Sequence, residues 1–333
     1  MSLVSVIMPT HNAERWVVDT LDNLNAQTWP HIELIVVDDA SSDGTVAAVR
    51  RTLADGFRHP WQIIELDRNV GPSAARNVAL KAVKGDWVQY LDSDDFLAPD
   101  KLALQMAVCE AAPADVAAVY SPWRRCYFEN GEISWEGPLV RPTMAGRAPL
   151  MCLVGNDRVL HGAGLARRSV LDRIGGFDET LRFWECEEVT VRLAKAGRLE
   201  PVPSDEPLYL WRVHREAAYI GGEGARYQTR AVAQSWIEQM VKAADGRTFD
   251  QMGLSPADRA DILADTTEWA RRLYGEDLGA FRQFVQTAKA LDPRIGPAHP
   301  AYASAVSRVF GYEAAEAVAR LGRIPGALLR RFR

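Results

Sequence analysis

The amino-acid sequence predicts an α/β fold: a mostly parallel sheet with helices on both faces, followed by a C-terminal helical subdomain. Over the first hundred residues, apolar runs of strand length alternate with segments of helical spacing, which is the pattern of a parallel sheet. The apolar runs are nearly continuous, as is typical of buried parallel strands. Beyond about residue 220 the spacing of apolar residues is helical almost throughout.

The first strands and helices end in polar loops. The expected strands are Val4–Met8, Leu34–Val37, Gln62–Leu66 and Trp87–Leu91. The expected helices are Ala13–Gln27, Thr45–Ala54 and Ser73–Val83. The loops after the strands are Thr10-His11-Asn12, Asp38-Asp39, Asp67-Arg68-Asn69 and Asp92-Ser93-Asp94. Because the carboxyl ends of parallel strands meet at one edge of a sheet, the sequence predicts a binding site at this edge.

The pattern of apolar residues changes twice in the remaining two thirds of the chain. The expected elements up to residue 220 are a helix at Asp100–Glu110, a strand at Val116–Tyr120, a short strand and a helix start within Gly162–Ile174, and a helix at Glu187–Gly197 closed by its glycine. Residues 121–160 combine Gly, Pro and Trp with short strand-like pieces and are expected to be irregular. A linker is expected at Gly221-Gly222-Glu223-Gly224, followed by helices over 225–244, 255–273, 277–290 and 300–321.

Composition excludes several classes of protein. The chain has 333 residues, of which 47% are hydrophobic and 25% charged, as in an ordinary soluble globular protein. A net charge of −5 argues against a nucleic-acid binder. No run approaches the ~20 apolar residues of a membrane span, and the N-terminus lacks the basic start of a signal peptide. The four cysteines form no CxxC pair, so reduced thiols in the cytoplasm are expected.

A cluster of carboxylates follows the fourth expected strand. The apolar run that ends at Leu91 is followed at once by Asp92, Asp94 and Asp95. Asp92 and Asp94 flank one small serine, so their side chains are able to converge. A hard divalent cation with oxygen ligands is the simplest reason for such a cluster. The alternative is a solvated acidic turn.

Four segments, in order along the chain, resemble family 2 inverting glycosyltransferases with a GT-A fold. They are the opening strand with Pro9-Thr10-His11-Asn12, the turn Asp38-Asp39-Ala40-Ser41-Ser42-Asp43-Gly44, the loop Asn69-Val70-Gly71-Pro72-Ser73-Ala74-Ala75-Arg76-Asn77, and Asp92-Ser93-Asp94-Asp95 in the place of the family's DxD metal motif. The resemblance implies a GT-A domain over 1–220, with a mixed, mostly parallel sheet, a nucleotide-binding half (1–100) and an acceptor half (101–220), and a helical subdomain over 221–333.

The resemblance implies that the donor is a nucleotide-diphosphate sugar, with a UDP-sugar favoured. The implied donor-binding residues are Pro9, Thr10, Asn12, Asp39, Gly71, Arg76 and Asp92. A carboxylate such as Asp39 is a good acceptor for the N–H of a uracil-like base. The alternative for Asp39 is turn chemistry and helix capping. Arg76 is expected to point its guanidinium at the diphosphate or at Asp92, unless it is an ordinary surface arginine.

The resemblance also implies a metal cofactor, Mn²⁺ or Mg²⁺, with Asp94 as its direct ligand. GT-A enzymes often add a histidine from a C-terminal position, and Leu210-Trp211-Arg212-Val213-His214 resembles that element. His214 is therefore the second candidate ligand. The alternative is an ordinary surface imidazole.

The pattern departs from the family where the general base is expected. The family carries Glu-Asp at the start of the helix after Gly-Gly-Phe-Asp, and counting back from Arg192 puts Cys186 in the place of that Asp. A thiol is an unusual base for an acceptor hydroxyl. Three interpretations remain: Glu185 or Glu187 is the base, Cys186 is the base, or the chain binds donor with weak or no catalysis. Trp184 beside them is a candidate for stacking on an acceptor sugar, or a half-buried packing residue.

The favoured function is a metal-dependent inverting transfer of a sugar to a hydroxyl of a glycan or glycolipid in polysaccharide or cell-surface glycan synthesis. The alternative is a glycosyltransferase-like nucleotide-binding module. Expected partners are the donor and a glycan or lipid-linked acceptor, without nucleic acid, and a homo-oligomer is possible. The basic, apolar tail over 318–333 suits contact with the inner face of a membrane, but a solvated helix end is the favoured explanation, and a disordered tail without a function is the third.

Overall fold

The computed structural model describes residues 2–144, 146–155, 158–214 and 225–293. The chain divides into two compact units, residues 1–218 and 219–333. The expected linker at 221–224, the helix expected over 300–321 and the basic tail lie outside the described residues.

The first unit contains a seven-stranded sheet in the order β10-β6-β9-β4-β1-β2-β3. Its strands are β1 (Val4–Thr10), β2 (Ile32–Asp38), β3 (Trp61–Glu65), β4 (Trp87–Tyr90), β6 (Val116–Tyr120), β9 (Gly164–Arg167) and β10 (Arg198–Pro201). Only β9 runs antiparallel to its neighbours, β4 and β6. The prediction of a mixed, mostly parallel sheet is confirmed, and the carboxyl ends of the parallel strands share one edge.

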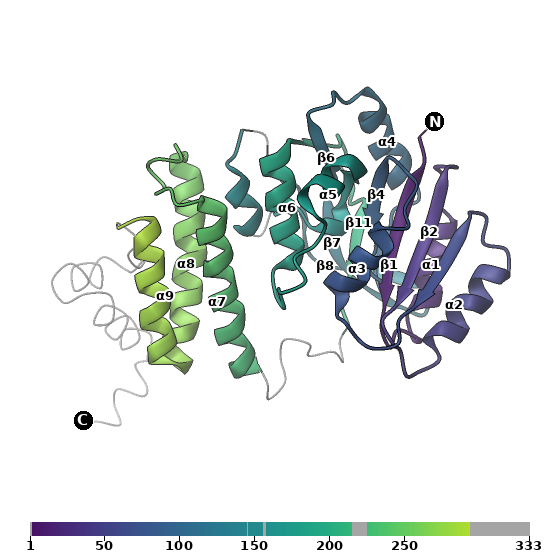
Figure 1. Cartoon of the computed structure of the whole chain (residues 1–333), viewed down its shortest axis with the longest axis horizontal. Helices are drawn as coiled ribbons and strands as arrows, with labels where there is room; N and C mark the ends of the chain where they lie inside the picture. The colour runs from purple at the N-terminus through teal and green to yellow at the C-terminus, as the bar shows by residue number, and fades with distance from the viewer. Residues whose placement is uncertain (1, 145, 156–157, 215–224, 294–333) are drawn as a thin grey trace. The chain divides into compact units, whose positions relative to one another are not determined.

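Helices cover both faces of this sheet (Figure 1). They are α1 (Val17–Asn25), α2 (Thr45–Ala54), α3 (Pro72–Leu80), α4 (Lys101–Ala111), α5 (Arg168–Ile174) and α6 (Glu185–Ala196). Buried side chains of α1, α2 and α4 form one core cluster with Val4, Val6 and Met8 of β1. Ile7 points to the other face because side chains alternate along a strand, and α3 packs against β1 and β2.

A second, four-stranded sheet extends the first unit, in the order β5-β11-β7-β8. Its strands are β5 (Phe96–Leu97), β7 (Trp123–Glu129), β8 (Glu132–Val140) and β11 (Tyr209–Arg212). The expectation of an irregular segment over 121–160 is therefore wrong for its first half. Asn130 and Gly131 join β7 to β8 with φ of 54° and 81°. Positive φ at both turn residues is the type I′ hairpin, which Asn-Gly favours.

Gly197 ends α6 where a stop was expected, but for a different reason. Its φ is −178°, which is extended backbone rather than the left-handed cap. A Cβ at this position would lie 2.4 Å from the Asp115 carbonyl oxygen. Glycine is required here because the chain passes close to the start of β6.

The second unit is helical over its described part, with α7 (Ala225–Ala244), α8 (Pro256–Glu276) and α9 (Leu278–Leu291), close to the expected ranges. Ser255 and Asp277 cap α8 and α9 by accepting backbone N–H groups. Trp236 stacks on Phe284 with ring centroids 6.1 Å apart in its core. In the described parts of both units, no helix combines the length and hydrophobicity needed to cross a bilayer.

Candidate active site

The loops after β1 and β2 are tied together at the carboxyl edge of the sheet. Thr10 Oγ1 donates to Asp38 Oδ1 at 3.1 Å, and Asn12 Oδ1 accepts the Ser42 N–H at 2.8 Å. The pairing of β1 with β4 ends at Ile7, so Pro9 lies beyond the ladder on that side and its missing N–H costs no strand bond there. Thr10 and Asn12 thus fix the shape of the edge that Asp39 occupies.

Asp39 organises the glycine loop. Its two carboxylate oxygens accept the N–H groups of Val70 at 2.7 Å and Gly71 at 2.8 Å. Gly71 has a φ of 88°, which glycine adopts without strain, and the space beside it is open. These bonds join Asp39 to a loop 31 and 32 residues further along the chain, so they are neither turn chemistry nor a helix cap. A carboxylate has about four lone-pair positions, so contact with a base N–H remains compatible with these bonds.

Arg76 points at Asp92, one of the two targets expected for it. The Arg76 Nη2 to Asp92 Oδ1 distance is 2.6 Å, and only 4% of the arginine is exposed. The surface-arginine alternative is wrong. Among the described residues, the buried Nε and Nη1 atoms of Arg76 have no hydrogen-bond partner. A buried guanidinium with unused donors is suited to an anionic ligand at this point.

His161 joins this cluster, and sequence reasoning missed it. Its Nε2 lies 3.4 Å from Asp92 Oδ2 and 4.0 Å from Cys186 Sγ. Each oxygen of Asp92 therefore faces a nitrogen of a basic side chain. Burial alone would raise the pKa of Asp92, but Arg76 and His161 outweigh it and hold this pKa well below its ordinary value.

The position of His161 follows from the direction of β9. The short 3-10 turn η2 (His161–Ala163) immediately precedes β9, and a strand that runs antiparallel begins at the edge where its parallel neighbours end. Three buried side chains hold this turn by donating to its carbonyl groups. They are Gln89 to Gly162 O at 2.8 Å, Gln105 to Ala163 O at 3.0 Å, and Ser121 Oγ to Ala163 O at 3.0 Å.

Three acidic or thiol candidates for the base lie at the start of α6. Glu185 Oε1 is 3.4 Å from Cys186 Sγ and 3.8 Å from Arg76 Nη1, so it belongs to the Asp92 cluster. Burial, followed by the charge of Glu185, raises the pKa of the Cys186 thiol well above its ordinary value. Glu187 is paired with Arg158, its Oε1 3.2 Å from Nε, and burial raises its pKa despite that pairing.

Trp184 precedes these residues in an unusual conformation. Its φ is 65°, which a bulky side chain rarely adopts, and it stands at the N-cap of α6. The Arg158 guanidinium lies over its ring, 5.2 Å from the centroid. Such backbone strain is commonly found at functional sites. A role of Trp184 in acceptor binding stays a prediction.

Asp94 and His214 come together on the other side of the turn. Asp94 Oδ2 and His214 Nε2 are 2.8 Å apart, and Trp16 packs on the imidazole with ring centroids 4.4 Å apart. A carboxylate oxygen and an imidazole nitrogen fit a transition metal such as Mn²⁺. Where the structure is described, no group of three or more His, Cys, Asp or Glu side chains could hold a metal. These two ligands would need oxygen atoms from a diphosphate to complete the coordination.

Asp95 has a structural role. It is buried. It accepts hydrogen bonds from the Tyr209 hydroxyl and, at 2.8 Å, from the Arg212 N–H. Burial raises its pKa well above the ordinary value, and the charges of Asp94 and Asp92 add to this. Asp95 therefore fixes β11, the strand that leads to His214, against the carboxylate turn.

Comparison with known proteins places this chain in a family. The family model described as "Glycosyl transferase family 2" matches residues 5–175, slightly more than half of the chain. An uncharacterised glycosyltransferase of Haemophilus influenzae is 26% identical over 252 residues, which cover 74% of this chain and 81% of that protein.

Solved structures establish the same fold. Staphylococcus aureus TarS 1-349 in complex with UDP-GlcNAc matches with a TM-score of 0.58 at 18% identity, covering 97% of this chain and 93% of that one. A Pyrobaculum calidifontis mannosyltransferase in complex with GDP-Man and Mn²⁺ matches with a TM-score of 0.55 at 20% identity, covering 96% and 85%. The chain therefore belongs to glycosyl transferase family 2 and is a glycosyltransferase with a GT-A fold.

Proposed function

We propose that the enzyme transfers a sugar from a nucleotide-diphosphate sugar to a hydroxyl group of a glycan acceptor, with inversion at the sugar carbon. The observation that carries this proposal is the convergence of Arg76, Asp92, Asp94 and His214 at the carboxyl edge of the sheet. Together they offer a cation, two carboxylates and an imidazole to a ligand that bears a diphosphate and a sugar. The nucleotide sugars in the two solved relatives support this donor class.

The donor is proposed to lie along the carboxyl ends of β1, β2 and β4. Asp39 would accept the base N–H, and the open space beside Gly71 leaves room for the ribose and phosphates. Arg76 Nη1 lies 3.8 Å from Glu185 Oε1 in the same cluster, and the unused donors of the guanidinium would contact the diphosphate or the sugar. Asp92, kept ionised by Arg76 and His161, is suited to accept hydrogen bonds from sugar or ribose hydroxyls.

Asp94 and His214 are proposed to hold the metal ion. A bound Mn²⁺ or Mg²⁺ would neutralise the charge that develops on the diphosphate leaving group. The Mn²⁺ in the mannosyltransferase relative supports this choice of cofactor. Asp95 holds β11, and with it His214, against the turn that carries Asp94. Trp16 packs on the imidazole ring of His214.

Glu185 is the proposed general base. The raised pKa of Cys186 leaves its thiol protonated at neutral pH, and Glu187 is engaged by Arg158. Glu185 alone among the three combines a carboxylate with a position in the Asp92 cluster. In an inverting displacement it would take the proton of the acceptor hydroxyl as the new glycosidic bond forms and the nucleoside diphosphate leaves.

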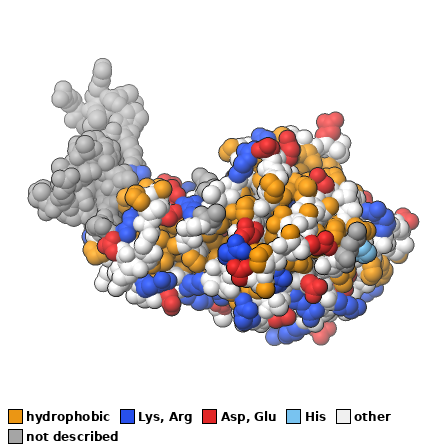
Figure 2. Space-filling view, turned by 90° about the horizontal axis from the view of Figure 1, so that it is seen from above, with side chains coloured by type: hydrophobic (Ala, Val, Ile, Leu, Met, Phe, Trp, Pro, Cys, Tyr) orange, Lys and Arg blue, Asp and Glu red, His pale blue; other side chains and the backbone are white. Residues whose placement is uncertain are grey.

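The acceptor class is proposed from the relatives. TarS is named a poly(ribitol-phosphate) β-N-acetylglucosaminyltransferase, and its curated sequence is 34% identical over 124 residues, 36% of this chain and 21% of its own length. A polymeric surface glycan is therefore the favoured acceptor. On the face shown in Figure 2, acidic and basic side chains are interspersed over the described residues, without a continuous basic field.

Donor binding and hydrolysis test the proposal. Calorimetric titration with UDP-GlcNAc and with GDP-mannose, in Mn²⁺ and in EDTA, should show metal-dependent binding of one of them. Asp94→Asn and His214→Ala should weaken it about tenfold or more, because each removes a metal ligand. Asp55→Asn, at an exposed aspartate directly after the C-terminal end of α2, is the control. Equal binding with and without metal would contradict the metal assignment.

A second candidate, donor binding without transfer, is favoured by the loss of the usual base at Cys186. The rate at which the bound donor is hydrolysed distinguishes the two candidate functions. Glu185→Gln should reduce turnover about a hundredfold with little change in donor affinity if Glu185 is the base. Tight donor binding with no turnover, in both wild type and Glu185→Gln, would support the binding module instead.

A further inference from the structure

A cavity of about 420 Å³ opens at the carboxyl ends of β6 and β10. Tyr120 and Pro201, the last residues of these strands, are paired in register, and the Val202 N–H donates to Tyr120 O at 2.8 Å. Both strands run in the direction of β4, because β9 between β4 and β6 is antiparallel to each. The cavity therefore opens at the edge of the sheet that also carries Asp92.

The cavity is connected to the Asp92 cluster by a short stretch of chain. Ser121, next to Tyr120, donates to Ala163 O through both its N–H and its hydroxyl, at 3.0 Å each. Ala163 belongs to η2, the turn that carries His161. The ends of β4 and β6 are two strand spacings apart, or ~10 Å. A short oligosaccharide is long enough to extend from one to the other.

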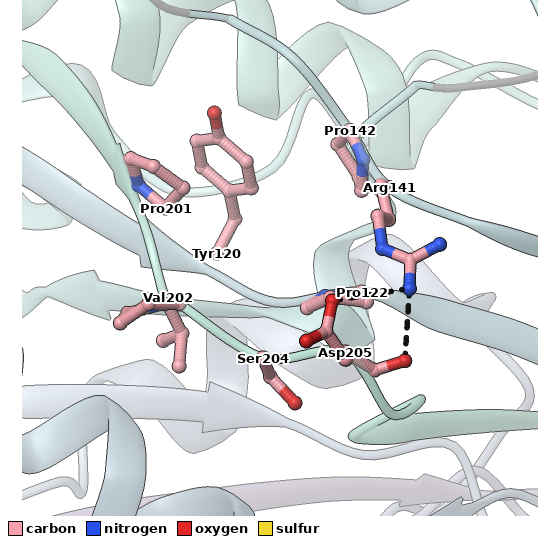
Figure 3. Close-up of a pocket in the computed structure, with 9 residues that line it drawn as sticks. Tyr120, Pro122, Arg141, Pro142, Pro201, Val202, Ser204 and Asp205 are labelled. Carbon is pink, nitrogen blue, oxygen red and sulfur yellow. Dashed lines mark hydrogen bonds and ion pairs between the residues drawn. The ribbon is translucent and has the colours of Figure 1, made fainter.

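Rigid apolar faces form much of the lining. Figure 3 shows Pro201, Tyr120 and Val202 on one side of the cavity, and Pro142 and Arg141 on the other. The prolines in the lining are Pro122, Pro142, Pro201 and Pro203. Because proline fixes its own φ, this wall is formed before a ligand arrives, which lowers the cost of binding. Flat C–H surfaces of this kind fit the apolar face of a sugar ring.

The rim carries an arginine–aspartate pair. Arg141 Nη2 donates to Asp205 O at 2.9 Å and lies 3.4 Å from Asp205 Oδ1, as the dashed lines in Figure 3 mark. Both side chains are exposed at the mouth. A sugar hydroxyl both donates and accepts, so it complements this pair. The pair has no net charge, which favours a neutral ligand over a phosphate or carboxylate.

We infer that this cavity binds a neutral sugar ring of the acceptor, away from the hydroxyl that receives the transferred sugar. The volume lies within the range of small-molecule sites, of the order of 300–1,000 Å³. The identification of the ligand as acceptor rests on the proposed function. The cavity shares no lining residue with the proposed donor site, so the two are separable by experiment.

The test uses the full-length chain and four probes: chitotetraose, cellotetraose, mannotetraose and a ribitol phosphate tetramer. Saturation-transfer NMR and calorimetry should detect binding of a neutral tetrasaccharide. Ser204→Trp, which fills the cavity from its half-exposed rim, should abolish it, and the double variant Arg141→Ala, Asp205→Ala should weaken it about tenfold. Arg50→Ala, at an arginine of comparable exposure that is paired with Glu65, is the matched control and should bind as wild type does.

Donor binding is measured on the same samples with UDP-GlcNAc and with GDP-mannose, each with Mn²⁺. It should be unchanged in every cavity variant, which also shows that these variants are folded. The inference is overturned if no neutral tetrasaccharide binds, if binding survives Ser204→Trp, or if only the ribitol phosphate tetramer binds. Tetrasaccharide binding without any nucleotide-sugar binding would leave the subsite standing and refute the proposed function. The two failures are therefore distinguishable.

Discussion

Asp92 is held between two basic side chains, and the sequence predicts only one of these contacts. Arg76 belongs to a loop with a recognisable glycine pattern, so its pairing with Asp92 was one of two expected outcomes. His161 belongs to no such pattern. Its place depends on β9 being antiparallel, which composition and spacing do not reveal. Side chains at the ends of parallel strands are therefore predictable from sequence, whereas those that precede an inserted antiparallel strand are not.

His161 is expected to position Asp92 through its Nε2 atom. Replacing it with leucine removes a hydrogen bond to a charged group, worth about 1.5–3 kcal/mol, which corresponds to roughly a 10- to 100-fold loss in kcat/KM for donor hydrolysis. Gln places an amide nitrogen near the same point and should recover most of the loss. His59→Leu changes another buried histidine, outside the site, and should leave kinetics unaltered. Equal damage by Leu and Gln would show that the imidazole serves packing alone.

Cys186 should behave as an unreactive thiol. Burial and the neighbouring Glu185 raise its pKa, so little thiolate forms at pH 8. Its alkylation by iodoacetamide, followed by mass spectrometry, should be at least about tenfold slower than that of N-acetylcysteine, and should accelerate above pH 9. Because the folded-state pKa is above the unfolded value, this residue's contribution to stability is present below about pH 8.5 and is lost as pH rises through the folded pKa. An alkylation rate that levels off near pH 7 would instead support Cys186 as the base.

At the scale of elements, the sequence located the parallel strands well and the β7–β8 hairpin poorly. Buried strands are continuous apolar runs, so β1, β2, β4 and β6 were found within two residues at each end. Strand β8 is an edge strand, largely exposed, and has no such run. The signal that was overlooked is the Asn130-Gly131 turn.

Gly197 shows how a correct boundary can have a different physical cause. An expected left-handed cap would tolerate asparagine, whereas an extended residue pressed against a carbonyl tolerates no side chain. Gly197→Ala should lower the free energy of unfolding by about 1–3 kcal/mol, because its Cβ would meet the Asp115 carbonyl oxygen. Urea denaturation measures this. Gly164→Ala, whose nearest neighbour outside the adjoining residues is at 3.4 Å, is the control in the same unit. Similar stability for both variants would refute the close approach.

At the scale of the whole molecule, the proposed donor-binding residues and the proposed base belong to one unit. Residues as distant in sequence as Arg76 and Glu185 meet in it, and Asp95 joins the carboxylate turn to β11. The helical unit has a separate core around Trp236 and Phe284. Its three described helices followed from their periodicity, because amphipathic spacing needs no long-range information.

Two cores in one chain predict two unfolding transitions, of which the donor affects one. Scanning calorimetry should resolve both, because each unit buries its own apolar residues. UDP-GlcNAc with Mn²⁺, at about 100 times its Kd, should stabilise the first unit by about 2.7 kcal/mol and raise its Tm by roughly 5–10 °C. The second transition should stay in place, and Asp94→Asn should remove the shift, because it removes a ligand of the proposed metal. A single transition that moves as a whole would show that the two units unfold cooperatively, and that the helical unit is coupled to the donor site.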